Sequence, residues 1–340
     1  MRKISRRNFL NDTLLLMSSV LFLHPSLSPL KANNKKDTGE YPGYLELEKR
    51  GLLSERIEKL YSIYENCHLC PRDCRVNRAN GEMGNCQATS KVKISSAAPH
   101  FGEEAPLVGQ RGSGTIFFSN CGLRCVFCQN YKISIEGEGV EISDKRLAES
   151  MIKIQKMGCH NINLVTPTHY VPNIVKAIQI AIPRGLHIPI VYNTSGYEKL
   201  ETLQLLDGII DIYLPDCKYM DSEHAAKYSG GVHNYPHYVK IALKEMYRQV
   251  GDLKVDKRGV AVRGLMVRHL VMPNRIAGTE KFLKFVAENL SKTTYINIMR
   301  QYRPEYKSFE YPKIARRITR SEYSETLKWA KKYGLKRLAR

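Results

Sequence analysis

Between residues 114 and 299 the chain alternates short apolar runs with longer amphipathic stretches. The short runs are rich in β-branched and aromatic residues, which predicts buried strands, and the stretches between them predict helices. The predicted strands are residues 114–119, 161–166, 189–193, 209–214, 264–271 and 294–299. The predicted helices are residues 144–157, 171–184, 197–206, 222–250 with a break at 230–236, and 278–290.

Strands and helices that alternate in this way build a parallel sheet with crossover helices. Six units predict an α/β fold, a partial (β/α)6 barrel of the TIM-like type, and a doubly wound sheet is the alternative. In a barrel the active site lies at the C-terminal ends of the strands. We therefore expect the polar segments that follow the predicted strands to share one rim.

The two ends of the chain differ from this repeating body. We predict a signal sequence at residues 1–32, a polar linker at 33–43, a Cys-rich N-terminal module at 44–90, the barrel at 91–310 and a basic helical tail at 311–340. The pattern also predicts a helix over residues 47–64, before the cysteines of the module.

The first residues have the pattern of an export signal. Arg6 and Arg7 are followed by Phe9 and Leu10, then by an apolar run at residues 13–23 and small residues. This pattern predicts the twin-arginine route to the periplasm or cell envelope, and a cytoplasmic protein is the alternative. The run is short for a membrane span, so we expect membrane contact only through an uncleaved signal.

Composition and charge bear on the number of domains and on the expected partners. The chain has 340 residues, 43% of them hydrophobic, which is enough for one large core plus a smaller module. The net charge is +20, from 53 Lys and Arg against 33 Asp and Glu, and much of it is terminal. Because no nucleic-acid-binding motif accompanies this charge, we do not expect nucleic acid as a partner.

Seven of the nine cysteines fall in two tight groups. The groups are Cys67-x2-Cys70-x3-Cys74-x11-Cys86 and Cys121-x3-Cys125-x2-Cys128, whereas Cys159 and Cys217 stand alone. Spacings of two and three residues are typical of metal ligands, because neighbouring thiolates can converge on one site. Disulfides are the alternative for an exported protein, but a group of three cannot close on itself.

Three cysteines can hold a [4Fe–4S] cluster and leave one iron open to a non-protein ligand. S-adenosylmethionine can chelate that iron, and one electron from the cluster then produces a 5′-deoxyadenosyl radical. The Cys121 group follows a predicted strand, and the aromatic Phe127 precedes its last cysteine. This pattern resembles the radical S-adenosylmethionine (radical SAM) superfamily. Structural zinc is the alternative, although it normally takes four ligands.

A longer set of motifs resembles one branch of that superfamily, the homologues of the pyruvate formate-lyase activating enzyme that carry an extra N-terminal cysteine motif. The matching segments are Cys67-His-Leu-Cys70-Pro-Arg-Asp-Cys74, Gly84-Asn-Cys86, His100-Phe-Gly-Glu-Glu104, residues 121–130, residues 161–169, Asn193-Thr-Ser-Gly196, Tyr213-Leu-Pro-Asp216, Asn297-Ile-Met299 and Gln301-Tyr-Arg-Pro304.

The resemblance implies that the cluster occupies the loop after the first barrel strand. It also implies cofactor-binding roles for Phe127, Thr166, Thr168, Asn193, Ser195, Asp216 and Lys218. The family has a Gly-Gly-Glu turn for the methionine amine where this chain has Thr166-Pro167-Thr168, so the usual carboxylate is missing. Asn193 and Ser195 match the loop at the nucleoside and carboxylate, and Asp216 and Lys218 match a run near the methionine end.

The resemblance further implies hydrogen abstraction from a substrate, which we expect to be a macromolecule such as a protein or a cell-envelope component. The partner that delivers electrons is expected to be a one-electron donor of the flavodoxin or ferredoxin type. Cys67, Cys70, Cys74 and Cys86 are predicted to form a second metal site, either structural zinc or an auxiliary [4Fe–4S] cluster. His169 is a candidate proton donor or substrate contact.

Two other hypotheses remain at this stage. One is a non-catalytic iron–sulfur electron-transfer protein, in which Cys217 could complete the Cys121 group. The other is a basic binding module that zinc holds together.

Overall fold

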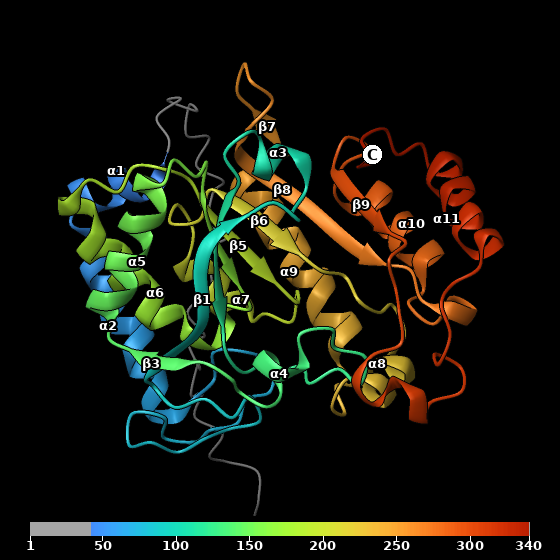
Figure 1. Cartoon of the computed structure of the whole chain (residues 1–340), viewed down its shortest axis with the longest axis horizontal. Helices are drawn as coiled ribbons and strands as arrows, with labels where there is room; N and C mark the ends of the chain where they lie inside the picture. Colours follow the sequence, from blue (N-terminus) through green and yellow to red (C-terminus); the bar gives the residue numbers. More distant parts are fainter. Residues whose placement is uncertain (1–41, 340) are drawn as a thin grey trace, which may run out of the picture. The chain divides into compact units, whose positions relative to one another are not determined.

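The computed structural model describes residues 42–339, so the predicted signal sequence and nearly all of the predicted linker lie outside the described residues. In this part of the chain the strands form one sheet in the order β3-β1-β2-β4-β5-β6-β8-β7, and β9 pairs with β8 (Figure 1). The strands are β1 (Val92–His100), β2 (Ser113–Phe118), β3 (Val140–Ile142), β4 (Ile162–Val165), β5 (Ile190–Thr194), β6 (Ile212–Pro215), β7 (Lys254–Val255), β8 (Ala261–Leu270) and β9 (Tyr295–Met299).

The parallel part of the sheet is a partial barrel. β2, β4, β5, β6, β8 and β9 pair parallel with one another in chain order. A doubly wound sheet would reverse this order at a switch point, and here the order never reverses. The predicted (β/α)6 fold is therefore confirmed, and its six predicted strands are all present.

Antiparallel strands extend the sheet at both sides, and the sequence pattern did not predict them. β1 pairs with β2 and β3 pairs with β1, so that they cover the open edge of the barrel at β2. β7 pairs with β8. The middle of β1 reads Ser95-Ser96-Ala97-Ala98 and is largely exposed, so it carries little of the apolar alternation that marks a strand.

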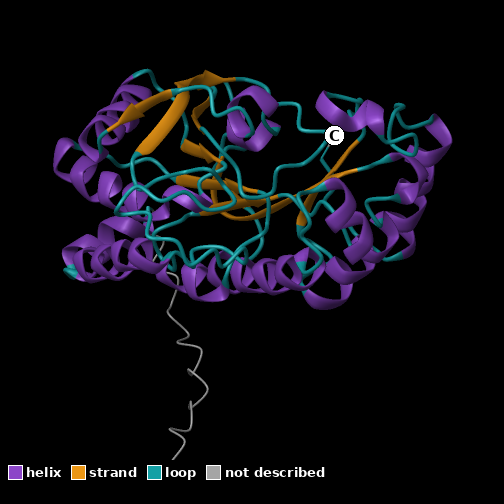
Figure 2. Cartoon of the chain, turned by 90° about the horizontal axis from the view of Figure 1, so that it is seen from below, coloured by secondary structure: helices purple, strands orange, loops and turns teal. Residues whose placement is uncertain are grey.

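The helices lie mostly on one face of the sheet (Figure 2). The predicted break in the helix at residues 230–236 is present, because α8 ends at Tyr228 and α9 begins at Tyr235. The helices are α1 (Gly43–Lys49), α2 (Leu52–Ser62), α3 (Ala105–Val108), α4 (Tyr131–Ser134), α5 (Asp144–Lys156), α6 (Val171–Ala181), α7 (Leu200–Leu205), α8 (Ser222–Tyr228), α9 (Tyr235–Val250), α10 (Thr279–Asn289) and α11 (Arg320–Lys332). Short 3₁₀ helices occur at Ile63–Asn66, Thr168–Tyr170, Ile182–Arg184, Pro273–Arg275 and Tyr306–Glu310.

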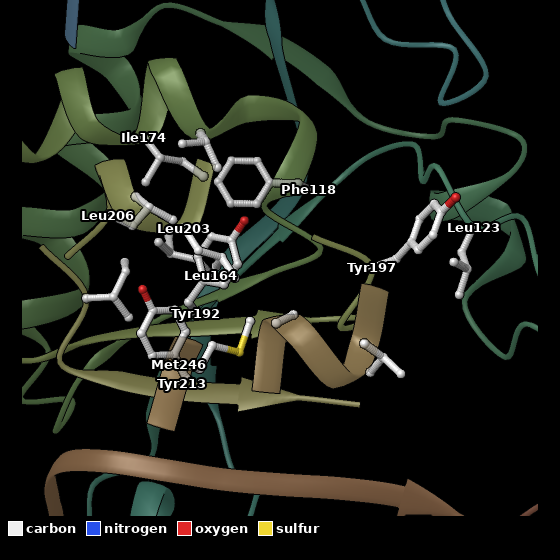
Figure 3. Close-up of a cluster of buried hydrophobic side chains, with 14 of the residues drawn as sticks. Phe118, Leu123, Leu164, Ile174, Tyr192, Tyr197, Leu203, Leu206, Tyr213 and Met246 are labelled. Atoms are coloured by element: carbon white, nitrogen blue, oxygen red, sulfur yellow. The ribbon is translucent and has the colours of Figure 1, made fainter. Parts of the chain in front are cut away.

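Alternation along the parallel strands divides the apolar side chains between two clusters. The outward-facing residues pack against the helices. Figure 3 shows Phe118, Leu164, Tyr192 and Tyr213 from four neighbouring strands together with Ile174, Leu203, Leu206 and Met246 from the helical layer. The inward-facing residues form a smaller cluster with Leu107 of α3 and Leu253 before β7; its strand residues are Val191, Ile212, Leu214, Ala261 and Met266. This inner cluster fills part of the barrel interior.

The N-terminal helices share the core of the barrel. Tyr44, Leu53 and Leu60 are buried in the same cluster as the outward-facing strand residues. The buried carboxylate of Asp211 accepts from the amide of Gly43 at 2.9 Å and from the amide of Ile190 at 3.0 Å. No helix among the described residues is both long enough and apolar enough to cross a membrane.

Candidate active site

A cavity of about 880 Å³ opens at the C-terminal ends of the parallel strands. Its walls come from the loop after β2, from the ends of β4, β5, β6, β8 and β9, and from the loop before α3. Most of the site residues predicted from the sequence line it. These are Cys121, Cys125, Phe127, Cys128, Thr166, Asn193, Ser195, Asp216 and Lys218.

The three cysteines lie in the loop after β2, and the sulfur atom of each has a hydrogen-bond partner. The hydroxyl of Ser229 donates to Cys125 Sγ at 2.9 Å, and Ser134 Oγ lies 3.0 Å from Cys128 Sγ. The amide of Leu123 donates to Cys121 Sγ at 3.4 Å. Such donors stabilise thiolate ligands.

Burial raises the pKa of the Cys125 thiol to about 12, so that a metal would have to displace its proton. No three His, Cys, Asp or Glu side chains of residues 42–339 are arranged to hold a single metal ion. A four-iron cluster is wider than one ion, and three thiols that open onto one cavity, with hydrogen-bond donors behind them, fit such a group.

Lys218 places a positive charge beside the cysteines. Its Nζ lies 2.6 Å from Asp216 Oδ2, and both side chains are mostly buried. Burial lowers the pKa of Lys218, but the nearby Asp216 and Cys125 outweigh it and raise the pKa above its usual range. Lys218 is therefore a fixed cation between a carboxylate and the thiols.

An ion-pair network also lines the cavity, and sequence reasoning gave it no role. Arg268 on β8 donates to Glu104 at 2.6 and 2.7 Å and to Glu103 at 2.5 Å. The amide of Asn297 on β9 also donates to Glu104, at 2.8 Å. Arg268 lies two residues after Met266 on the inner face of β8, and this alternation is the signal that could have identified it.

Burial alone would raise the pKa of Glu104. The hydrogen bond and charge of Arg268 outweigh burial, so the pKa of Glu104 lies below its usual range. Glu104 is therefore ionised inside the cavity wall.

Thr168 does not line the cavity, and it contacts a buried carboxylate instead. Its hydroxyl donates to Glu198 Oε1 at 2.6 Å, and the hydroxyl of Thr194, which does line the cavity, donates to the same oxygen. Tyr192 donates to the other oxygen at 3.3 Å. Burial raises the pKa of Glu198 to about 7, although these hydroxyl donors oppose the shift. No signal in the sequence indicated a role for Glu198, because its contact with Thr168 forms only when two separate segments of the chain pack together.

Thr166 has a φ of +59°, in the left-handed region that favours glycine. The resemblance aligns this position with the first glycine of a Gly-Gly-Glu turn. The chain thus keeps the backbone conformation of a glycine turn with a threonine side chain in it.

Two residues singled out by the sequence lie away from the cavity. His169 is buried, its Nε2 lies 2.7 Å from the carbonyl oxygen of Ser119, and burial lowers the pKa of His169 to about 3. Cys217 is fully buried next to Met220 and is not part of the cavity wall.

The four N-terminal cysteines gather around a second, smaller cavity. Cys67, Cys70, Cys74 and Cys86 line it together with Arg78 and His169. All nine cysteines of the chain are unpaired in the structure.

With this geometry in view, comparisons with known proteins identify the family. A sequence model of the radical SAM superfamily matches residues 115–247, from β2 to α9, a range that includes the three cysteines. Uncharacterized protein MJ0674 of Methanocaldococcus jannaschii is 36% identical over 301 residues, which cover 86% of this chain and 82% of that protein. The chain belongs to the radical SAM superfamily. A second relative, Uncharacterized protein MJ0808 of the same organism, is 25% identical over 276 residues, or 75% of each chain.

Radical SAM enzymes are also found among similar solved structures. A radical SAM methyltransferase from Sphaerobacter thermophilus is 12% identical, with 87% of this chain and 91% of that chain covered and a TM-score of 0.43. A domain of pyruvate-formate lyase-activating enzyme from Bacteroides vulgatus is 11% identical, with 58% and 91% covered and a TM-score of 0.33. The family assignment rests on the sequence matches. As a radical SAM enzyme, the protein belongs to a superfamily whose members use S-adenosylmethionine and an iron–sulfur cluster.

Proposed function

We propose that this radical SAM enzyme holds a [4Fe–4S] cluster on Cys121, Cys125 and Cys128 and abstracts hydrogen from its substrate. The observation that carries the proposal is the shared cavity of these cysteines and the polar ends of the parallel strands. When bound, the cluster and S-adenosylmethionine supply a 5′-deoxyadenosyl radical. The chain supplies the positions and charges around them.

Lys218 and Asp216 form a charged pair that lines the cavity together with the cysteines, and Lys218 is suited to the carboxylate of the cofactor's methionine. The Thr194 hydroxyl donates a hydrogen bond to Glu198. Its oxygen can therefore accept a hydrogen bond from the methionine ammonium. Asn193 and Ser195 line the same rim and are available to the nucleoside.

The other wall of the cavity is available to a substrate. The cavity volume lies in the range of ligand sites, and Glu103, Glu104 and Arg268 line the same cavity as the cysteines. We retain the similarity to activating enzymes, a protein or cell-envelope substrate, and an electron donor of the flavodoxin or ferredoxin type as parts of this proposal.

The test is reductive cleavage of S-adenosylmethionine by anaerobic, iron-reconstituted protein with dithionite. We expect equal amounts of 5′-deoxyadenosine and methionine from the wild type. We expect none from the variant Cys121→Ser/Cys125→Ser/Cys128→Ser, because the cluster has lost its ligands. Cys159→Ser, which changes a buried cysteine outside the cavity, serves as the matched control.

Iron-loaded wild type that forms no 5′-deoxyadenosine would contradict the proposal. If S-adenosylmethionine also left the paramagnetic resonance spectrum of the reduced protein unchanged, the hypothesis of a non-catalytic electron-transfer protein would be preferred.

A further inference from the structure

Arg78 is a fully buried cation beside the four N-terminal cysteines. Its Nε donates to the carbonyl of Ala88 at 3.0 Å and its Nη2 to the carbonyl of Thr89 at 2.6 Å, and the guanidinium stacks on Tyr64 at 4.4 Å. No carboxylate among residues 42–339 forms an ion pair with it. Because a buried charge without a counter-charge costs several kcal/mol, the surroundings of Arg78 require negative charge.

The sulfur atoms are the available source of that charge. Arg78 Nη1 lies 3.9 Å from Cys67 Sγ. On the other side of the group, the backbone amide and the side-chain amide of Asn85 donate to Cys74 Sγ at 3.4 and 3.3 Å. Thiols and disulfides are neutral, whereas four thiolates around a metal centre keep a net negative charge. Arg78 therefore favours a metal–thiolate site over disulfides or free thiols.

The same cysteine group is attached to the loop of Cys121. Asn120, which precedes Cys121, donates to the carbonyl of Gln87, which follows Cys86, at 2.9 Å. Arg72 donates to the carbonyl of Gly122 at 2.8 Å and to the carbonyl of Gly230 at 2.7 Å. Gly230 adjoins Ser229, the donor to Cys125 Sγ.

Gly122, the residue after Cys121, lies next to the N-terminal cysteine group. A Cβ atom added at Gly122 would lie 3.9 Å from Cys70 Sγ and 4.0 Å from Cys86 Cβ. The residue next to Cys121 thus lies beside two cysteines of the N-terminal group. In Figure 1 the loops that carry this group lie on the same side of the sheet as α4, which follows the Cys121 loop.

We infer that Cys67, Cys70, Cys74 and Cys86 bind a second [4Fe–4S] cluster, which relays single electrons to the cluster at Cys121, Cys125 and Cys128. The inference rests on the proposed function, since a relay needs a redox centre to receive its electrons. Zinc would satisfy the charge of Arg78 equally well, but it has no redox chemistry. The contact between the two cysteine loops therefore favours iron.

The relay makes and breaks no covalent bond. A one-electron donor of the flavodoxin or ferredoxin class reduces the second cluster from the 2+ to the 1+ core state. The electron then passes to the cluster at the Cys121 loop, and the second cluster returns to 2+. Each S-adenosylmethionine that is cleaved consumes one such electron. Cys74 is half-buried next to the exposed Asn85, so the donor would approach on that side.

Metal content gives the first test, on full-length protein purified without oxygen. We expect about eight irons per wild-type chain and about four in each of two variants, Cys121→Ser/Cys125→Ser/Cys128→Ser and Cys70→Ser/Cys74→Ser. Cys159→Ser should keep the wild-type value. Stoichiometric zinc with about four irons in the wild type would overturn the relay, while the loss of those irons in the Cys121 variant would leave the proposed function standing.

Spectroscopy gives the second test, and it needs no variant that has to fold. In fully reduced wild type we expect the paramagnetic resonance signals of two clusters broadened by their mutual magnetic interaction. Two independent, unbroadened signals would overturn the inferred contact of the two clusters.

Reduction kinetics give the third test. In Cys70→Ser/Cys74→Ser, reduction of the remaining cluster by reduced flavodoxin, followed by its visible absorbance, should slow about tenfold or more, equivalent to about 1.4 kcal/mol in activation free energy. Reduction by dithionite should not slow. An unchanged rate with flavodoxin would rule out the relay without affecting the proposed function.

Discussion

Glu198 is a carboxylate with no exposed surface, held beneath the cavity by three hydroxyl groups. The Thr194 hydroxyl donates a hydrogen bond to Glu198 and accepts one from the amide of Gly196 at 3.3 Å, so its oxygen keeps one lone pair that can accept from a cation in the cavity. The chain lacks the carboxylate of the Gly-Gly-Glu turn at position 168, and Thr168 donates to Glu198 instead. The carboxylate of Glu198, from the loop between β5 and α7, thus lies next to position 168, where the family has the glutamate of its Gly-Gly-Glu turn.

We predict that Glu198→Gln weakens the binding of S-adenosylmethionine by roughly tenfold, about the value of one hydrogen bond to a charged group. The glutamine amide would donate toward the threonine hydroxyls and turn their lone pairs away from the cavity. Equilibrium dialysis with iron-loaded protein measures the dissociation constant. Iron content should stay at the wild-type value, and Asp211→Asn, which changes a buried carboxylate far from the cavity, is the matched control. An unchanged dissociation constant would refute the role of Glu198.

At the same scale, the contacts of Arg268 show what the sequence could not reveal. Glu104 lies before the first parallel strand, whereas Arg268 and Asn297 lie on the last two. Only closure of the sheet brings these three side chains within hydrogen-bond distance. The cysteine trio was predictable, because its members are close in the sequence and their spacing already fixes their chemistry.

At the scale of elements, the buried Asp211 joins the start of α1 to the beginning of β5 through the amides of Gly43 and Ile190. Burial raises the pKa of Asp211 to about 7, although the two amides oppose the shift. In the unfolded chain the carboxyl ionises near its usual value, so between about pH 4 and pH 7 the folded state holds the proton more tightly. The stability that Asp211 contributes is complete below this range and is lost as the pH rises through about 7.

We therefore predict that the advantage of the wild type over Asp211→Asn in the free energy of unfolding shrinks from about pH 5 to about pH 8. The expected change is on the order of 2 kcal/mol. Thermal unfolding of both proteins across this range measures it. Glu201→Gln, on the exposed side of α7, is the matched carboxyl-to-amide control. A difference that stays constant with pH would contradict the prediction.

At the scale of the whole molecule, the metal chemistry and the predicted export route depend on each other. The twin-arginine route carries folded proteins, and an iron–sulfur cluster has to be inserted before export. The signal residues lie outside the described residues, and export of this protein stays a proposal.

We predict that Arg6→Lys/Arg7→Lys retains the protein in the cytoplasm with its iron content unchanged, because the conservative change removes the twin-arginine pattern and keeps the charge. Cell fractionation with immunodetection measures the distribution. Arg2→Lys is the matched control and should be exported like the wild type. A cytoplasmic location of the wild type would support the alternative that the N-terminus is no export signal.

The sequence by itself determined the family chemistry and the parallel strands. Cys121, Cys125 and Cys128 lie within eight residues, and each buried strand is a short run dominated by apolar residues, so both signals are local. The tertiary structure decided the rest. The strand order shows a barrel and not a doubly wound sheet. The tertiary structure also places Glu198 within hydrogen-bond distance of Thr168 and Glu104 within hydrogen-bond distance of Arg268. It places Gly122 beside Cys70. Those features join residues far apart in the chain, and only strand pairing and close packing fix such distances.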